Sequence, residues 1–196
     1  MSARSSPDVQ GVVFAEASLG YRGVDKHDVY VSPLTQLAIK TIRKSVNKLG
    51  IVSSQPYSLL QKILQAYKIR VEWFDGVVAY EDCQAQGEDP QRYQQITEAL
   101  QLGDDPSRVV VFEAMLDGIV AAQKAGCYVV GLTFFHSHKE LFDAGANTSV
   151  PSYFQAIPLL EKMKSKPGAK VIMADRNISP LGLHAESSAA DNVKEY

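Results

Sequence analysis

The sequence predicts one α/β domain, with a mostly parallel sheet of five or six strands and helices on both faces of the sheet. Three observations lead to this prediction. The chain of 196 residues is long enough for one domain with a real core, and its 45% apolar and 21% charged residues are typical of a globular protein. Short apolar runs also alternate with segments of helical periodicity, which is the pattern of parallel βα units.

The first half of the domain alternates expected strands and helices. In chain order these are a strand at Gly11–Phe14, a polar loop over 20–33, a helix over 34–48, a strand at Leu49–Ser53, a helix from about Pro56, an extended segment over 73–79 and a helix over 90–102. The helix over 34–48 is expected because Leu34, Leu37, Ile39, Ile42 and Val46 recur as candidate core positions. Pro56 suits a first helical turn, and Gly103 suits a helix end.

The second half continues the same alternation. Val109–Glu113 is almost continuously apolar, as expected for a strand that is buried on both faces. A short helix over 117–125, a strand over 127–132, a helix over 150–164 and a strand at Lys170–Ala174 follow. We therefore divide the chain into an N-terminal extension (1–9), a core domain (10–175) and a polar tail (176–196) that is expected to order only against a partner, as a docking arm.

Composition narrows the possible partners and location. The formal net charge of −2 gives no reason to expect nucleic acid or an anionic membrane surface as a partner. The longest apolar runs are too short to span a bilayer, and the first residues do not resemble a secretory signal. The 2 cysteines do not suggest a disulfide framework. The expected location is intracellular, cytoplasmic by default, with an organellar location left open.

Ligands of parallel sheets bind at the carboxyl ends of the strands, which directs attention to Ala15, Ser53 and Glu113. The segment 107–132 contains a strand ending in Glu113, a helix with Gly-Ile and Ala-Ala, then Ala-Gly and the next strand. It resembles the fourth motif of haloacid dehalogenase (HAD) phosphatases, especially the phosphoglycolate phosphatase and β-phosphoglucomutase branch. Other segments resemble this branch in order and spacing: 11–19, 49–54, 73–79 and 141–147. The resemblance implies a Rossmann-like HAD core over about 10–160.

The resemblance also implies chemistry that the residues do not support. The family reaction needs an Asp nucleophile at the end of the first strand and a second Asp two residues later as general acid/base. These positions are Ala15 and Ala17. Glu16 is not expected to substitute, because side chains alternate across a strand and Glu16 should point away from that face.

The third and fourth motifs are altered as well. The family's Lys, which holds the phosphate, matches Glu88, an anion that would repel a phosphate. Of the acidic pair that orients Mg²⁺, Glu113 remains, but its neighbour is Ala114. Asp117 lies one helical turn on and could approach the metal, although capping of the helix is the simpler role. No cofactor is therefore expected, and Mg²⁺ only if the chain is a divergent hydrolase.

Three further features have both a functional and a structural interpretation. Ser53 and Ser54 could hold an anion with the backbone amides of the helix near Pro56, or simply start that helix. His136 and His138 have a spacing that suits two metal ligands, but a polar surface loop is the simpler interpretation. The loop over 20–33 is too short for the helical cap of the family branch, so a capless fold with an open cleft is expected.

Two functional hypotheses follow. The first is a catalytically inactive HAD-like pseudoenzyme that serves as a structural or regulatory protein–protein interaction module, with a larger complex as a plausible setting. The alternative is a divergent Mg²⁺-dependent phosphate-ester hydrolase, or a protein that binds a phosphorylated metabolite without cleaving it, using Ser53 and Glu113.

Overall fold

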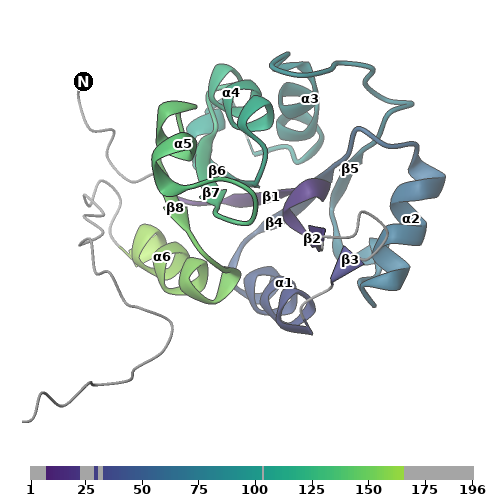
Figure 1. Ribbon diagram of the computed structural model, residues 1–196, viewed down its shortest axis with the longest axis horizontal. Coiled ribbons are helices and arrows are strands. Elements are labelled where there is room, and N and C mark those ends of the chain that lie inside the picture. Colours follow the sequence, from purple (N-terminus) through teal and green to yellow (C-terminus); the bar gives the residue numbers. More distant parts are fainter. Residues whose placement is uncertain (1–7, 23–28, 31–32, 103, 166–196) are drawn as a thin grey trace, which may run out of the picture.

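A six-stranded parallel sheet forms the centre of the molecule (Figure 1), in the strand order β5-β4-β1-β6-β7-β8. The structure is a computed structural model and describes residues 8–22, 29–30, 33–102 and 104–165. The predicted α/β fold is confirmed. The strands of the sheet are β1 (Gly11–Ala15), β4 (Lys48–Val52), β5 (Gly76–Val78), β6 (Val109–Glu113), β7 (Tyr128–Leu132) and β8 (Thr148–Val150).

Helices cover both faces of the sheet, as predicted (Figure 1). One face is covered by α1 (Pro33–Ser45), α2 (Tyr57–Ala66) and α6 (Tyr153–Ser165), and the other by α3 (Gln91–Ala99), α4 (Leu116–Lys124) and α5 (His138–Asp143). On α1, Ile39 and Ile42 are fully buried. Leu34 and Leu37 were expected in the core but are 51% and 53% exposed, because the buried face centres on residues 35, 38, 39 and 42.

Several short elements refine the prediction. The expected loop over 20–33 contains an antiparallel pair, β2 (Tyr21–Arg22) with β3 (Val29–Tyr30). Three 3₁₀ turns are η1 (Glu16–Ser18), η2 (Val71–Trp73) and η3 (Pro106–Arg108). The extended segment expected over 73–79 is therefore shorter, since Trp73 belongs to η2 and the strand begins at Gly76.

The far edge of the sheet corrects one prediction. The three residues of β8 pair with β7, and α6 begins only at Tyr153, so Val150 is a strand residue and not a helix start. A strand of three residues is too short to show any periodicity in the sequence. The strand expected at Lys170–Ala174 and the tail over 176–196 lie outside the described residues.

The segment after β7 is also more ordered than the expected polar loop. Ser137 and Glu140 form a capping box, in which each side chain bonds the backbone N–H of the other residue. This cap starts α5 at His138. None of the helices in the described ranges has the length and apolar content needed to cross a membrane.

The topology places a crevice between β1 and β6. After β1 the chain passes through α1 on one face, and after β6 it passes through α4 on the other, so the two connections leave in opposite directions. Such a switch point opens a ligand crevice at the carboxyl ends of the strands. The turn η1 is fixed beside it, because the buried Tyr153 hydroxyl donates to the Ser18 carbonyl at 2.7 Å.

Candidate functional site

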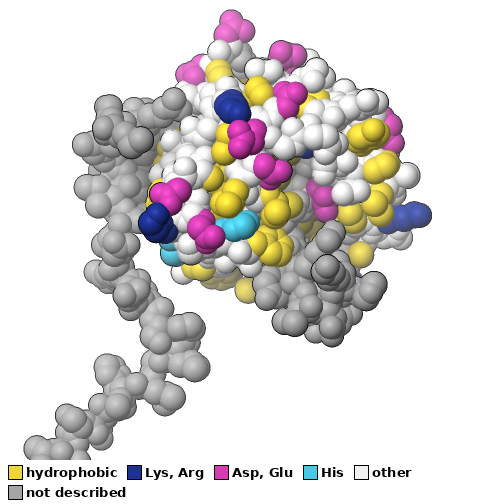
Figure 2. All heavy atoms as spheres, turned by 45° about the horizontal axis from the view of Figure 1, so that its top comes forward, with side chains coloured by type: hydrophobic (Ala, Val, Ile, Leu, Met, Phe, Trp, Pro, Cys, Tyr) yellow, Lys and Arg dark blue, Asp and Glu magenta, His cyan; other side chains and the backbone are white. Residues whose placement is uncertain are grey.

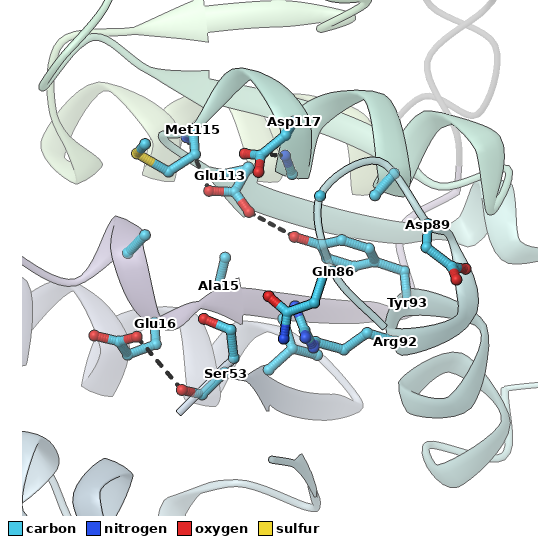
Figure 3. A pocket seen from close by; sticks show the side chains of 16 residues that line it. Ala15, Glu16, Ser53, Gln86, Asp89, Arg92, Tyr93, Glu113, Met115 and Asp117 are labelled. Atoms are coloured by element: carbon cyan, nitrogen blue, oxygen red, sulfur yellow. Dashed lines mark hydrogen bonds between the residues drawn. The ribbon is translucent and has the colours of Figure 1, made fainter. Parts of the chain in front are cut away.

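A polar pocket of about 250 Å³ lies at this crevice (Figure 3). We call it the strand-end pocket. The carboxyl ends of β1, β4 and β6 supply Ala15, Ser53 and Glu113 to its lining. Most of the remaining lining comes from η1, the segment 86–89 and the N-terminal parts of α3 and α4. Residues that are widely separated in the sequence therefore meet at one edge of the sheet, as the parallel topology requires.

Ala15 and Ala17, which the resemblance aligns with the two family aspartates, both line this pocket. Ala15 is the last residue of β1 and is 4% exposed. Figure 3 shows it between Glu113 and Ser53, and Ala17 lines the same pocket. The methyl groups of these two alanines can neither attack phosphorus nor transfer a proton.

The side chain of Glu16 points in a different direction from the one expected from strand alternation. Because β1 ends at Ala15 and η1 begins at Glu16, alternation no longer sets the direction of this side chain. Glu16 lines the strand-end pocket, and its Oε2 accepts a long hydrogen bond from Ser53 Oγ at 3.4 Å. The pocket thus contains a carboxylate next to Ala15, the position that the resemblance aligns with the family nucleophile.

Glu113 is held by internal hydrogen bonds. Its Oε1 accepts from the backbone N–H groups of Ala114 at 2.7 Å and Met115 at 3.0 Å. Its Oε2 accepts from the Tyr93 hydroxyl at 2.5 Å, drawn as a dashed line in Figure 3. Burial raises the pKa of Glu113 above its ordinary value, and these hydrogen bonds oppose that rise. Burial, reinforced by Glu113, also raises the pKa of Tyr93.

A glycine makes room for this carboxylate. A Cβ atom at Gly118 would lie 2.2 Å from Glu113 Oε2 and 2.5 Å from its carboxyl carbon, which no real contact allows. The first turn of α4 therefore packs directly on Glu113. Glu113 acts here as a buried link between β6, α3 and the beginning of α4.

The residues present do not fit Mg²⁺. The ion requires several oxygen ligands in near-octahedral geometry. Ala15 and Ala114 offer none from their side chains, and Glu113 is engaged by three donors. Asp117 is exposed, and its Oδ1 accepts from the Gly118 N–H. No group of three or more His, Cys, Asp or Glu side chains among the described residues could hold a metal ion.

The basic residue that lines the pocket does not occupy the position of the family's Lys. Glu88, which matches the motif Lys, is exposed and forms a surface ion pair with Lys124 at 2.8 Å. Arg92, in the first turn of α3, lines the pocket instead (Figure 3). Arg92 lies on α3, after the turn that contains Glu88, so matching the motif by position does not find it.

Arg92 also carries an unsatisfied donor. Its Nη2 donates to the Ala85 carbonyl. Its Nε is the one buried side-chain nitrogen or oxygen atom of the described residues that has no hydrogen-bond partner. Such an atom is unfavourable in a folded protein unless a ligand or water completes it.

Ser53 and Ser54 both line the pocket, but the helix after them is not an open anion site. Ser53 is 3% exposed, and its Oγ accepts from the Gln55 N–H at 3.0 Å. Pro56 has no N–H, and the Tyr57 N–H donates to Glu81 Oε2 at 2.9 Å. Ser53 therefore faces the pocket as a hydroxyl group, and neither Pro56 nor Tyr57 adds a free amide beside it.

His136 and His138 lie outside the strand-end pocket. His138 is the first residue of α5, and its Nδ1 lies 2.7 Å from Ser149 Oγ. His136 Nδ1 is 3.9 Å from Glu140 Oε1. Each histidine thus has a local polar partner, and the structure does not bring the two rings together with a third ligand.

Comparisons with known proteins agree with this architecture. A Thermotoga maritima protein designated a β-phosphoglucomutase superposes with a TM-score of 0.67 at 18% identity, over 79% of this chain and 99% of that one. A hydrolase from Pseudomonas syringae superposes with a TM-score of 0.60 at 20% identity, over 69% of this chain and 62% of that one. At these identities the likeness shows the fold alone.

Sequence comparison is more specific. Validoxylamine A 7'-phosphate phosphatase from Streptomyces hygroscopicus subsp. limoneus is 32% identical over 96 residues, which is 49% of this chain and 44% of the relative. The chain thus spans less than half of that relative's length. Residues 8–126, more than half of the chain, match the profile of the haloacid dehalogenase-like hydrolases. The chain therefore belongs to the haloacid dehalogenase-like hydrolase family.

Proposed function

We propose that this family member is catalytically inactive towards phosphate esters and serves as a protein–protein interaction module, either as a free regulator or as a subunit of a larger complex. The observation that carries the proposal is Ala15, whose methyl group takes the place of the phosphorylated aspartate in the strand-end pocket. Ala17 removes the acid/base in the same turn, and no resident Mg²⁺ is proposed.

Exposed large side chains that follow the strand ends support an interaction role. Tyr57, Tyr80 and Met115 follow the carboxyl ends of β4, β5 and β6 and are 39%, 39% and 40% exposed. Large amphipathic side chains of this kind are common anchors at protein interfaces. We further propose that no helical cap covers this edge, because α1 occupies much of the connection between β1 and β4. On the face seen in Figure 2, acidic side chains outnumber basic ones, which argues for protein over nucleic acid.

The catalytic half of the proposal is tested with purified protein and a panel of small phosphate esters, with and without Mg²⁺. Wild type is expected to release no phosphate beyond the amount released by Glu16→Gln and Glu113→Ala variants, which change pocket carboxylates. Comparison with these variants separates pocket chemistry from a contaminating phosphatase. Mg²⁺-dependent turnover that disappears in Glu113→Ala would overturn the proposal.

The interaction half is tested by native size, with gentle lysis and identification of comigrating proteins. The protein is expected to run well above its own 21.5 kDa with fixed companions. Met115→Ser and Tyr80→Ser should release the companions, whereas Phe142→Ser, an exposed apolar residue on α5, should not. A wild-type protein that runs alone contradicts the complex-subunit form of the module.

A divergent hydrolase, or a protein that binds a phosphorylated metabolite, is the second candidate. The observation that favours it is Glu16, a carboxylate that lines the pocket within hydrogen-bonding reach of Ser53. Turnover or saturable phosphate-ester binding that is lost in both Glu16→Gln and Ser53→Ala would support it. The matched control is Glu81→Gln, because Glu81 contacts the start of α2 and is not among the residues lining the pocket.

A further inference from the structure

The charged side chains are divided unevenly between the two faces of the sheet. Residues 33–75, which include α1 and α2 on one face, carry seven Lys and Arg side chains against two Asp and Glu side chains. Residues 76–146, which include α3, α4 and α5 on the other face, carry four against eleven. The small net charge of −2 is therefore the sum of a basic face and an acidic face.

An open groove of about 670 Å³ lies on the basic face, along α2 at the edge of the molecule (Figure 1). We call it the α2 groove. Part of its lining is a stripe of α2, because residues three, four and seven positions apart share one side of a helix: Ser58, Gln61, Lys62 and Gln65. The segment 68–72, which follows α2, and the buried Leu64 complete the lining.

The cations of the α2 groove are short of counter-charges. Lys62 and Lys68 are exposed and form no ion pair with any described residue. Arg70 is the third cation, and it lies 3.5 Å from Glu72, the one carboxylate among the described lining residues. Three like charges around one groove repel one another, so an anionic occupant would lower the electrostatic energy.

Further cations extend the basic surface beyond the groove. Lys40 Nζ lies 5.0 Å from the centre of the Trp73 ring, and Arg43 donates a hydrogen bond to the Trp73 carbonyl. Trp73 belongs to η2, whose other two residues, Val71 and Glu72, line the α2 groove. The C-terminal half of α1 thus adjoins the groove, and an occupant longer than the groove would meet more positive charge.

The size and chemistry of the groove favour a short acidic peptide over other polyanions. Proteins that bind nucleic acid commonly neutralise about 6–10 phosphates, whereas the described lining residues offer three cations. The hydroxyl and amide groups of Ser58, Gln61 and Gln65 can bond a peptide backbone. The 10 residues of α2 span about 15 Å, which matches about five residues of an extended chain.

We propose that the α2 groove docks an extended acidic segment of a partner protein, with Asp or Glu side chains of the partner on Lys62, Lys68 and Arg70. This inference rests on the interaction role proposed above. It adds a second contact surface and the chemistry of the partner, and the strand-end pocket takes no part in it.

The experiment measures binding of a fluorescent peptide to the purified full chain. The peptide has about eight residues and alternates Glu with Val, which favours an extended chain. It is expected to bind saturably, and more weakly as salt rises, because salt screens exposed charges. The same peptide with Lys in place of Glu should not bind. A single-stranded oligonucleotide of equal charge and vesicles that contain phosphatidylserine are expected to bind more weakly than the acidic peptide.

Two variants remove groove cations with little risk to the fold. Lys68 has a φ of 54°, which glycine adopts without strain, so Lys68→Gly should be at least as stable as wild type in urea unfolding. Lys62→Gln changes an exposed residue of α2. Each variant should weaken binding of the acidic peptide by about threefold, and the two together by about tenfold.

A third variant and a control separate the groove from the net charge. Glu72→Gln removes the groove carboxylate and frees Arg70, so it should tighten peptide binding by about threefold. The matched control is Lys139→Gln, which removes a cation of α5 on the other face and should leave binding unchanged.

Three results would overturn the inference. These are no saturable binding of the acidic peptide, unchanged binding when both groove lysines are replaced, and tighter binding of the oligonucleotide or the vesicles than of the peptide. Native size in a lysate tests the proposed function separately. Fixed companions without peptide binding reject the groove alone, whereas a protein that binds the peptide but runs alone rejects the complex-subunit form alone.

Discussion

Replacing Tyr93 with phenylalanine tests whether Glu113 is a buried structural carboxylate. The substitution removes one hydroxyl group, which donates to Glu113 Oε2 at 2.5 Å, and leaves the ring that packs in the core. A hydrogen bond to a charged group contributes about 1.5–3 kcal/mol, so unfolding free energy should fall by about 2 kcal/mol. For a chain of this size, that loss lowers Tm by about 4–8 °C.

The loss of unfolding free energy in Tyr93→Phe should depend on pH in a defined direction. Burial raises the pKa of Glu113, so the folded state binds this proton more tightly than the unfolded state does. The contribution of Glu113 to stability is therefore present below its unfolded pKa and is lost as pH rises through its folded pKa. The Tyr93 hydroxyl stabilises the ionised form, so its removal should cost about 1 kcal/mol at low pH and more once Glu113 is ionised.

The assay is urea unfolding of wild type and variant between about pH 5 and about pH 9, with the difference in unfolding free energy taken at each pH. Tyr128→Phe is the control, since its hydroxyl belongs to another buried tyrosine and forms no hydrogen bond with Glu113. A Tyr93→Phe difference that stays within about 0.5 kcal/mol over the whole range, the size of an ordinary surface substitution, would refute the assignment of Glu113 as a buried, bonded carboxylate.

Three further predictions concern other parts of the fold. Gly118→Ala should destabilise the protein by about 1–3 kcal/mol in urea unfolding, because the new methyl group collides with the Glu113 carboxylate. A stabilised variant, which is the result expected at an unobstructed helix position, would contradict this contact. Ser137→Ala removes the capping box of α5 and should cost about 1 kcal/mol, measured in the same way, whereas an unchanged stability would show that the cap contributes little. Burial raises the pKa of Cys127 to about 12, so this thiol should react with a thiol reagent only after unfolding, and rapid labelling of the native protein would argue against its burial.

The strands around the pocket could be predicted because each appears in the sequence as a run of apolar residues. The strands β1, β6 and β7 are buried along their whole length, so nearly every residue is apolar and the run is recognisable without any partner. The same topology directed attention to the ends of β1, β4 and β6, and in the structure these three ends line one pocket. The short β8 was missed because three residues carry no periodic signal.

Parts of the site could not be predicted, because they depend on where elements end and turn. Strand alternation placed Glu16 on the wrong side, since the residue at which β1 gives way to η1 is not marked in the sequence. Arg92 could not be singled out from the sequence, because it does not occupy the family position of the Lys. Its side chain lines the pocket because α3 packs against the sheet beside β4 and β5.

The sequence by itself determined which chemical groups the strand ends can offer: methyl groups at Ala15, Ala17 and Ala114, and a carboxylate at Glu113. These identities are local, and packing does not change them. The tertiary structure alone decided how the remaining groups are used. Tyr93 and Gly118 lie on different helices, and only their packing around Glu113 turns a possible metal ligand into a buried, fully bonded carboxylate. Hydrogen-bond partners and burial are set by contacts between distant segments, which the order of residues does not reveal.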